Sequence, residues 1–404
     1  MTSIRDPLWN NIRLDDVARR LIDTPVFQRL RYVRQLGLAY LVYPGATHTR
    51  FEHALGAYHL ARLTLALLEE RGALHRVAAA DRDVVCAAAL LHDVGHHPFS
   101  HALEEIGAQH HEEAARPLIT EGPVADELRA SLAPDAPEQV YALIRGQSTS
   151  PLQGLISGSL DLDKIEYLKR DAFMCGVPYG EIDVDRLVNS LTIVDDAEGR
   201  RVIGVIEKGL SALESLLFAK YQMYRNVYWH HAVRSATAMY KRLVDDAIRT
   251  GALDERELSA LTDEGLLHRL DARGDASLLT ALRQRRLYKR AFERPAGDLP
   301  DGVGDWIAVD LERARETEDA LGSRFGLAPG ELLLDFPEKP RMLGLDLPVV
   351  HRDGSVGRLT RQGLPGSINL PTLSDELYRS ARVLRVFVAR PIQLGDREIG
   401  AVLA

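Results

Sequence analysis

The stretch "LLHDVGHHPFSHALEE", Leu90–Glu105, places four histidines and one aspartate within ten residues. Imidazole side chains are costly to bury without partners, and they are the commonest metal ligands in proteins. Apolar residues at helical spacing precede the stretch, and Gly95 predicts the end of that helix. At a helix end His92 and Asp93 can turn toward one point, although neighbours within a helix point about 100° apart. The pair predicts a site for Zn, Fe, Mn or a similar cation.

Further ligands are expected from two other segments. The string "HTRFEH" offers His53 upstream, and "DLDK" offers Asp163 downstream. A site built from His53, His92, Asp93 and Asp163 would leave coordination positions open for water and substrate. Open positions distinguish catalytic metal sites from structural ones. The remaining histidine of the upstream string, His48, is expected to be a surface or satisfied core residue.

The helix expected around Asp163 carries chemistry on one face. At about 100° per residue, Asp163, Lys164, Tyr167 and Asp171 fall in one stripe roughly 100° wide. A buried stripe with unpaired charges would be destabilised, so this face is expected to line a charged pocket. A second stripe at i, i+4 and i+8 contains Lys220, Tyr224 and Tyr228. Taken alone, that second stripe indicates amphipathic packing, and Arg29 and Arg31 taken alone indicate solvated helix residues.

The composition is that of a globular protein. The chain has 404 residues, 46% of them hydrophobic and 27% charged, with a net charge of −8. This balance favours solubility and argues against a broad nucleic-acid-binding surface. The two cysteines form no C-x-x-C motif, the first residues contain no signal-like apolar run, and no stretch approaches about 18 apolar residues. We therefore expect a cytoplasmic protein with no membrane segment.

The order of elements predicts a mainly α protein. Helical spacing dominates residues 1–294, with a break at Pro25, a second helix ending near Gly37 and a helix after 160 that Ser159 can cap. The segment 293–305 is rich in Pro and Gly. Short strand-like runs follow it, in 331–340, 346–350 and 381–390. We expect a helical unit over 1–294 and a small α+β lobe over 295–404.

Four motifs in this order resemble a known family. They are "HTRFEH", "HDVGHHPFSH", "HE" at 111–112 and "DLDKIEYLKRD". The set resembles the HD-domain phosphohydrolases, and most closely their deoxynucleoside triphosphate triphosphohydrolase branch. The resemblance begins near the first residues and extends to about residue 245, with a fainter continuation in the C-terminal lobe. It implies a helical HD-domain core and a bound divalent metal ion (Mn, Fe, Zn, Ni or Mg).

The resemblance also implies roles for individual residues. The metal ligands would be His53, His92, Asp93 and Asp163. The catalytic group would be His96, His101, Glu104 and His111, with Glu104 orienting His101. Substrate would contact Gln35, Leu36, Arg50, Lys164, Tyr167, Asp171, Lys220 and Tyr228. A regulatory nucleotide would contact Asp23, Gln28 and Arg31.

By the same resemblance, the expected reaction is metal-dependent hydrolysis of deoxynucleoside triphosphates (dNTPs). Water attack at the α-phosphorus would release a deoxynucleoside and inorganic triphosphate. The expected partners are a nucleotide substrate, an activating nucleotide and further copies of the chain in a dimer or tetramer. Two alternatives stay open at this stage. One is a phosphoesterase acting on nucleic-acid ends or another nucleotide, and the other is a non-catalytic nucleotide-sensing module.

Overall fold

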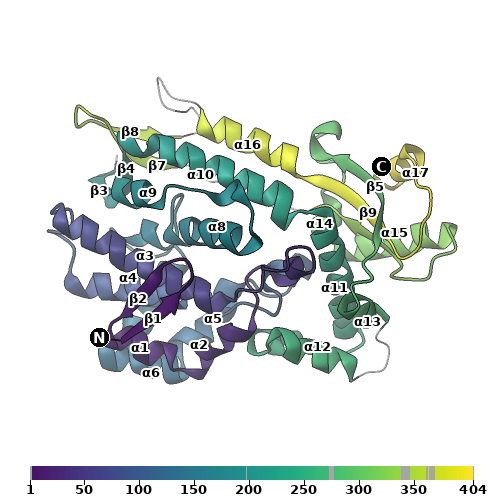
Figure 1. The fold of residues 1–404 in the computed structure, drawn as a ribbon, viewed down its shortest axis with the longest axis horizontal. Helices are drawn as coiled ribbons and strands as arrows, with labels where there is room; N and C mark the ends of the chain where they lie inside the picture. Colours follow the sequence, from purple (N-terminus) through teal and green to yellow (C-terminus); the bar gives the residue numbers. More distant parts are fainter. Residues whose placement is uncertain are drawn as a thin grey trace.

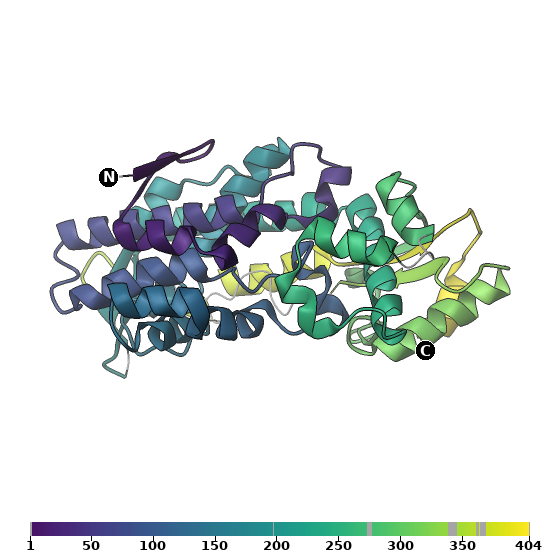
Figure 2. The same cartoon turned by 90° about the horizontal axis from the view of Figure 1, so that it is seen from below.

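The computed structural model describes residues 2–196, 198–272, 277–337, 346–360, 363 and 369–403. Helices form most of the molecule, and the strands lie in three small sheets (Figures 1 and 2). In the described part of the chain no helix is long and apolar enough to cross a membrane. The mainly α architecture with small sheets toward the C-terminus confirms the predicted fold class.

The N-terminal segment is a β-hairpin followed by short helices. The hairpin pairs β1 (Thr2–Asp6) with β2 (Asn10–Leu14), and α1 (Asp16–Ile22), α2 (Pro25–Arg29) and the 3₁₀ segments η1 (Leu30–Tyr32) and η2 (Gly37–Leu41) follow. Thr24 caps α2, and Pro25 begins it, as expected for a proline at the first helical position. The second helix was predicted to reach Gly37, but it ends at Arg29. Beyond it the backbone of Gln35 bonds to His48 rather than along a helix.

The central bundle holds the largest apolar core. Its helices are α3 (Arg50–Glu70), α4 (Ala79–Leu91), α5 (His111–Thr120), α6 (Gly122–Ser131), α7 (Ala136–Ile144) and α8 (Leu162–Cys175). Helix α3 packs against both α4 and α8, and residues such as Leu55, Leu90 and Ile165 are fully buried between them. This packing brings together three segments of the chain, near residues 50, 90 and 160.

Asp161, rather than Ser159, caps α8. Its side chain accepts a hydrogen bond from the Lys164 amide at 2.9 Å. Ser159 instead bonds to Asp346 near the C-terminal part of the chain. The predicted cap was therefore wrong by two residues, because Ser159 finds a tertiary partner and an aspartate offers an equally good cap oxygen.

The second half of the chain adds two long helices and most of the strands. The segments are α9 (Val184–Ser190), β3 (Leu191–Asp195), β4 (Arg201–Ile206), α10 (Leu210–Met223), the π-helical turn η8 (Tyr224–Tyr228), α11 (His231–Arg249), α12 (Asp263–Asp271), α13 (Ser277–Arg283) and β5 (Lys289–Pro295). After residue 295 come α14 (Trp306–Val309), α15 (Leu311–Arg324), β6 (Leu332–Asp335), β7 (Leu347–Val350), β8 (Val356–Leu359), α16 (Leu370–Ala381), β9 (Val383–Val388) and α17 (Asp396–Leu403).

Two sheets pair strands from both sides of residue 295. One has the order β3-β4-β7-β8, and the other has the order β5-β9-β6. The three strand-like runs predicted after residue 295 contain β6, β7 and β9, although residues 338–340 of the first run lie outside the described residues. Strands β1 to β5 and β8 were not predicted. The division at 294/295 stays a prediction about how the sequence is organised.

Candidate active site

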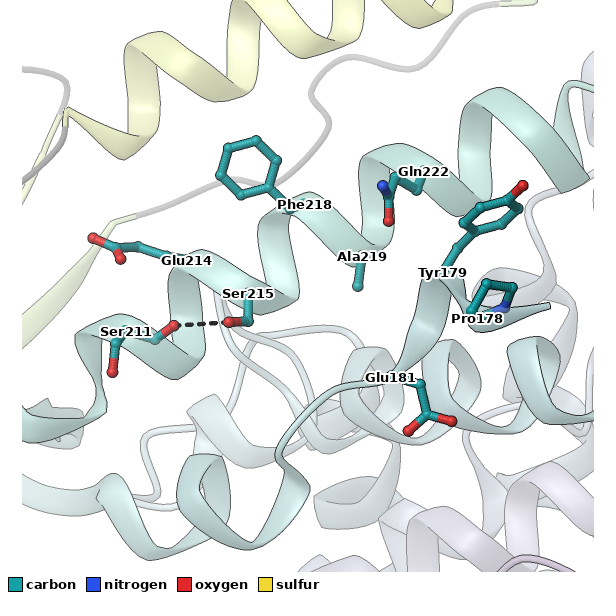
Figure 3. A pocket seen from close by; sticks show the side chains of 9 residues that line it. All are labelled: Pro178, Tyr179, Glu181, Ser211, Glu214, Ser215, Phe218, Ala219 and Gln222. Carbon is teal, nitrogen blue, oxygen red and sulfur yellow. Dashed lines mark hydrogen bonds between the residues drawn. The ribbon is translucent and has the colours of Figure 1, made fainter.

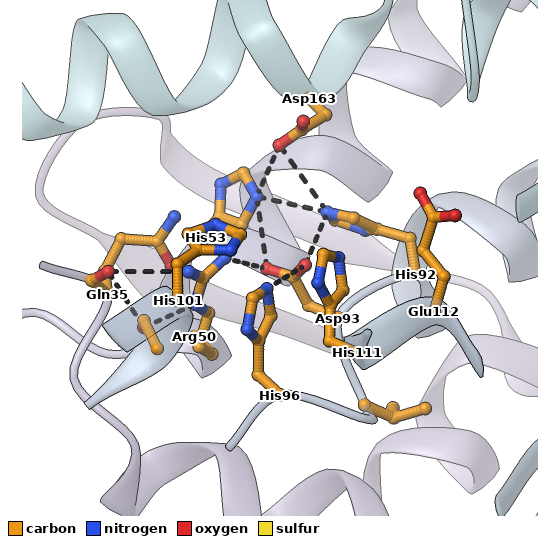
Figure 4. Close-up of polar contacts among 12 residues, drawn as sticks. Gln35, Arg50, His53, His92, Asp93, His96, His101, His111, Glu112 and Asp163 are labelled. Atoms are coloured by element: carbon orange, nitrogen blue, oxygen red, sulfur yellow. Dashed lines mark hydrogen bonds and ion pairs between the residues drawn. The ribbon is translucent and has the colours of Figure 1, made fainter. Parts of the chain in front are cut away.

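The four side chains predicted as metal ligands meet at one point (Figure 4). Helix α3 carries His53, the end of α4 carries His92 and Asp93, and the first turn of α8 carries Asp163. The Nε2 atom of His53 lies 3.2 Å from Nε2 of His92, 3.0 Å from Oδ1 of Asp163 and 3.5 Å from Oδ2 of Asp93. The Nε2 atom of His92 lies 3.4 Å from Asp93 and 3.6 Å from Asp163. The bundle thus brings together residues up to 110 positions apart.

The chain leaves the helix just where the ligands are needed. Helix α4 ends at Leu91, so His92 is its C-cap and Asp93 lies beyond it, which lets both side chains face the same side. Gly95 follows because α5 passes very close. A Cβ atom there would lie 2.1 Å from the His111 carbonyl oxygen and 2.5 Å from the Ala115 nitrogen. The glycine therefore allows α5, and with it His111, to approach the metal ligands.

Glu166 orients the buried metal-ligand candidate His53. Its Oε2 lies 2.6 Å from Nδ1 of His53, while its Oε1 accepts hydrogen bonds from Arg170 at 2.7 Å and from Trp9 at 2.9 Å. A Cβ atom on Gly56 would lie 1.9 Å from Oε1, so the glycine makes room for this carboxylate. Such outer carboxylates fix the ring orientation of metal-binding histidines. Sequence reasoning missed Glu166, although its place one turn after Asp163 was a usable signal.

The charges of this cluster suit a divalent cation. Burial opposes protonation of His53, but the Asp163 and Glu166 carboxylates raise its pKa to about 10. Burial likewise opposes ionisation of Asp163, yet its contacts with His53 and His92 hold its pKa well below the usual range. The Nε2 atoms of His53 and His92 lie 3.2 Å apart, so protons on both nitrogens would repel each other. A cation bound by two imidazoles and two carboxylates resolves this conflict, and the donor set fits first-row metals.

A second cluster of histidines adjoins the first. His96, His101, Glu104 and His111 bring one potential ligand or proton-transfer atom each within 4.8 Å of one another. Glu104 binds Nδ1 of His111 at 2.7 Å and Nδ1 of His101 at 3.3 Å. The rings of His96 and His111 stack with centroids 3.8 Å apart, and Nε2 of His96 lies 3.2 Å from Asp93. The four predicted catalytic side chains therefore form one group that contacts the metal-ligand candidates.

The members of this group differ in exposure and charge. Burial lowers the pKa of His111 to about 4, although its bond to Glu104 opposes the shift. Burial, with Arg50 and His111 nearby, holds the pKa of His96 well below its usual range. Both imidazoles are therefore neutral at neutral pH. His101 differs because 59% of its side chain is exposed. It is the member of the group that an incoming molecule reaches first.

Three basic side chains lie on the elements around these clusters. Arg50 is 4% exposed and bonds to Asp93 at 2.7 Å and to Ser100 at 3.1 Å. Its predicted role in binding phosphate stays a prediction, and in this structure its guanidinium pairs with the metal-ligand candidate Asp93. Lys164 pairs with Asp161 and donates to the Gly158 carbonyl at 3.0 Å. Lys220 on α10 is 2% exposed.

Asp171 is bound from two sides. Its Oδ1 lies 2.7 Å from Nε2 of His48, and its Oδ2 accepts a hydrogen bond from the Tyr228 hydroxyl at 2.7 Å. Tyr228 belongs to the π-helical turn η8, which joins α10 to α11. Tyr167, one turn before Asp171 on α8, has its ring centroid 6.5 Å from that of His53. The structure thus brings His48 into the predicted substrate-binding group, where sequence reasoning had assigned it no role.

Gln35 carries a buried acceptor without a partner. The residue is 6% exposed, and its Oε1 has no hydrogen bond within the described residues. Leu36 follows, partly buried against the core. The next residue, Gly37, has φ +51°, and a Cβ there would lie 2.7 Å from the Phe99 carbonyl oxygen. This close approach brings residues 34–37 against the loop between α4 and α5, residues 92–110, which we call the histidine-rich loop.

Two side chains outside the predicted set tie these loops together. Asp263, at the start of α12, accepts from the Phe99 amide at 2.8 Å and from the Arg34 amide at 3.0 Å. Arg29 donates to the carbonyls of Val94 at 2.9 Å and His96 at 2.8 Å. The interpretation of Arg29 as a solvated helix residue was wrong, because its guanidinium is turned inward to bind loop carbonyls. Periodicity cannot reveal this, since the partners lie about 65 residues away.

The residues predicted for a regulatory nucleotide lie on α1, α2 and η1. Asp23 and Arg31 are exposed, and Gln28 is half-buried. Gln28 accepts from Arg31 Nε at 2.8 Å and donates to the Ile22 carbonyl at 2.8 Å. The Arg31 guanidinium also stacks 3.5 Å from the Phe51 ring centroid. Their role in binding a nucleotide stays a prediction.

A surface depression of about 500 Å³ lies elsewhere, between α10 and the segment after α8 (Figure 3). The side chains that line it are Pro178, Tyr179, Glu181, Ser211, Glu214, Ser215, Phe218, Ala219 and Gln222. None of them belongs to the two clusters, and the charged ones are both glutamates. An acidic hollow repels a polyphosphate, so we place the candidate active site at the clusters instead.

Comparison with known proteins agrees with this geometry. The family model described as "HD domain" matches residues 50–168, which contain all four metal-ligand candidates. The model described as "HD associated region" matches residues 182–363. An uncharacterized protein of Methanocaldococcus jannaschii is 35% identical over 356 residues, which cover 88% of this chain and 73% of that protein. The chain belongs to the HD-domain phosphohydrolase family. HD domains depend on metal, and this member has a His/Asp cluster suited to a divalent ion.

Other relatives share the fold over most of the chain. The solved structure of a hypothetical protein from Aquifex aeolicus matches with a TM-score of 0.74 and 29% identity, covering 96% of both chains. The deoxynucleoside triphosphate triphosphohydrolase SAMHD1 of Gallus gallus is 27% identical over 380 residues. That match covers 79% of this chain and 61% of the relative.

Proposed function

We propose that this HD-domain phosphohydrolase cleaves dNTPs to a deoxynucleoside and inorganic triphosphate. The observation that carries the proposal is the contact between the two clusters, where His96 lies 3.2 Å from the metal-ligand candidate Asp93. A metal site alone serves many reactions, but a metal site that adjoins a proton-transfer group suits phosphate ester hydrolysis. Relatives named as deoxynucleoside triphosphate triphosphohydrolases support this choice of substrate.

In this proposal basic side chains bind the triphosphate. Lys164 and Lys220 lie on α8 and α10, and Arg50 lies beside Asp93. Three cations offset much of a triphosphate's charge without making the whole protein basic. The unpartnered Oε1 of Gln35 accepts a hydrogen bond from a sugar hydroxyl. Leu36, Tyr167, Asp171 and Tyr228 line the space for the nucleoside.

In the proposed reaction one cluster binds the metal and the other transfers a proton. His53, His92, Asp93 and Asp163 would hold the divalent ion, which would supply Lewis acidity at the site. Water attacks the α-phosphorus, a new P–O bond forms, and the bond to the 5′ oxygen breaks. His101 donates a proton to that oxygen, because it is the exposed member of the group and Glu104 holds its Nδ1.

His111 and Glu104 prepare the proton donor. Neutral His111 donates its Nδ1 hydrogen to Glu104, which leaves Nε2 as an acceptor for a water or substrate hydroxyl. Glu104 stays ionised between two imidazoles, because His101 and His111 hold its pKa well below the usual range although burial opposes this. The Glu104 carboxylate also lies 3.3 Å from Nδ1 of His101 and so orients that ring. We also propose that the chain acts as a dimer or tetramer, with an activating nucleotide near Asp23, Gln28 and Arg31.

The test is product analysis with labelled water. The purified chain is incubated with each dNTP, each ribonucleotide and short single-stranded DNA and RNA, with Mn²⁺ or Mg²⁺, in ¹⁸O-water. We expect deoxynucleoside and triphosphate from dNTPs, with the label in the triphosphate. Monophosphate with pyrophosphate, or cleavage of nucleic-acid ends alone, would favour another phosphoesterase. Intact ligands that raise the melting temperature would favour a sensing module.

Two variants separate metal binding from proton transfer. Asp163→Ala is expected to lose bound metal and turnover while staying folded, because a helix tolerates alanine. His111→Gln is expected to keep its metal and lose about 10²–10⁴-fold in kcat, the usual range for removing a general acid–base group. Metal analysis and single-turnover rates measure both. Full metal occupancy in Asp163→Ala would refute the ligand assignment.

A further inference from the structure

Two consecutive glutamates in the histidine-rich loop have different partners. Glu104 binds His101 and His111, as described above. Glu105 points to α11 instead, where its two carboxylate oxygens accept from Nη1 and Nη2 of Arg234, both at 2.8 Å. Lys241, two turns along the same helix, also binds Glu105 at 2.8 Å. Glu104 of the proton-transfer group is therefore adjacent in sequence to Glu105, which forms a bidentate ion pair with Arg234.

Arg234 connects this loop to the C-terminal sheet. Its Nε lies 3.1 and 3.0 Å from the two oxygens of Asp335, the last residue of β6. Strand β6 pairs with β9 in the sheet β5-β9-β6. The side chain of Arg234 is 5% exposed and that of Asp335 is fully buried. The Arg234 guanidinium thus binds both a carboxylate of the histidine-rich loop and a carboxylate of the C-terminal lobe.

The ion network around Glu105 is directional. Two cations, Arg234 and Lys241, face two anions, Glu105 and Asp335. The planar guanidinium presents its donors in a rigid fork, so a bidentate pair fixes orientation as well as distance. Burial opposes ionisation of Glu105, but Arg234 and Lys241 hold its pKa well below the usual range. The pair therefore stays ionised and keeps its geometry.

The loop needs an external anchor. Residues Ser100–Ala102 and Glu104–Ile106 form two single 3₁₀ turns, η3 and η4. Such short turns have little stability of their own. Phe99, just before η3, and Ser100, its first residue, have φ values of 57° and 63°, which non-glycine residues adopt only when their surroundings impose it. Contacts from other elements therefore decide where Glu104 lies.

We propose that Arg234 is a positioning residue for the His101–Glu104–His111 group, and that the C-terminal sheet acts on this group through Asp335, Arg234 and Glu105. The inference rests on the proposed function for the role of that group in proton transfer. It assigns the C-terminal lobe a part in catalysis without any contact between that lobe and the substrate.

Arg242 provides a matched control. It lies on the same helix, eight residues after Arg234, and its side chain is also 5% exposed. It also binds carboxylates of the C-terminal part of the chain, Glu318 and Asp319 on α15, both at 3.1 Å. Its ion pairs hold α15 and leave the histidine-rich loop untouched. Loss of Arg242 therefore reports on lobe docking, and loss of Arg234 reports on loop position.

The first experiment compares kinetics in the full-length, metal-loaded protein. Arg234→Met and Asp335→Asn are each expected to lower kcat about 10–100-fold, since a shift of about 1 Å at a catalytic group has effects of this size. The KM and the bound metal should change less than about twofold. Arg234→Lys is expected to be intermediate, because a lysine can satisfy one carboxylate but lacks the fork. Arg242→Met should stay within about twofold of the parent.

The second experiment needs no turnover. Hydrogen exchange of a peptide covering 97–110 is expected to be faster in Arg234→Met and Asp335→Asn, and unchanged in Arg242→Met. Equal effects of Arg234→Met and Arg242→Met on kcat and exchange would overturn the proposal, because both would then report general loosening. Unchanged exchange in Arg234→Met would overturn it as well. If the parent hydrolyses no dNTP, the proposed function fails while the exchange comparison still decides the anchoring.

Discussion

Glu166 acts on the candidate metal site without being one of its ligands. Its carboxylate holds Nδ1 of His53, so the ring presents Nε2 to the other ligands. Replacement by glutamine keeps the size but removes the charge that favours a basic, correctly oriented imidazole. We expect Glu166→Gln to weaken metal binding about 10–100-fold, as outer-shell changes do. Competition with a chelator, followed by metal analysis, measures the change.

A control for that variant is Glu113→Gln. Glu113 lies on α5 and pairs with Arg145 at 3.3 Å, without a bond to any of the four ligand candidates. It should leave the affinity for metal unchanged. Equal metal affinity in the parent and in Glu166→Gln would show that His53 keeps its orientation without the carboxylate.

Single residues were predictable where the chemistry is dense in the sequence. His92 and Asp93 stand out because histidines crowd around them, and the motif resemblance supplies His53 and Asp163. Arg29 and Glu166 were misread or missed, because nothing in their local sequence shows what they touch. A charged side chain turned inward toward distant carbonyls has the same sequence signature as one in water.

At the level of elements, α12 anchors the loops of the site through Asp263. Burial raises the pKa of Asp263 from 3.8 to about 6, although the Phe99 and Arg34 amides oppose the shift. The folded protein therefore binds this proton more tightly than the unfolded chain. Its contribution makes folding less favourable as pH rises from about 3.8 to 6, the direction that linkage requires for a raised carboxyl pKa.

This linkage gives a measurable difference. Between pH 4.5 and 7 the Asp263 contribution is expected to lower the free energy of unfolding by about 2 kcal/mol, at about 1.36 kcal/mol per pKa unit. Asp263→Asn removes it, so the parent should lose stability relative to the variant as pH rises. Urea denaturation of both proteins at the two pH values measures this, and effects of other groups cancel in the comparison. A constant difference between the two proteins would contradict the raised pKa.

Element types were predicted better than element ends. The helices that carry Asp163 and His92 were expected, and both exist. The second helix was expected to reach Gly37 but ends at Arg29, because the following backbone bonds to the segment before α3. Local spacing reports which face of a helix is apolar, whereas a helix end depends on the partners that compete for its backbone.

At the scale of the whole molecule, the two sheets join the segments before and after residue 295. Strand β9 lies between β5 and β6, and β7 pairs with β4 in parallel. We expect a chain of residues 1–294 to lose cooperative thermal unfolding, since it would lack β7 beside β4 and β9 beside β5, and it would leave Arg234 buried without Asp335. Circular dichroism with a temperature scan measures this.

Addition of residues 295–404 as a separate polypeptide is the matching control. It should restore a cooperative transition if the sheets re-form across the cut. A chain of residues 1–294 that melts cooperatively at the parent's temperature would instead show that the predicted boundary separates two independent folding units.

The sequence by itself determined the mainly α class, the family resemblance and the four metal-ligand candidates, because these follow from periodicity and from dense, ordered motifs. Only the tertiary structure decided that Glu166 orients His53, that Arg50 pairs with Asp93, and that Arg234 joins the histidine-rich loop to the C-terminal sheet. The physical reason is that a sequence pattern records only local relations, whereas these contacts join residues far apart in the chain. Spacing along a helix records one face of one element, while a hydrogen bond or ion pair depends on which distant side chain folding brings opposite.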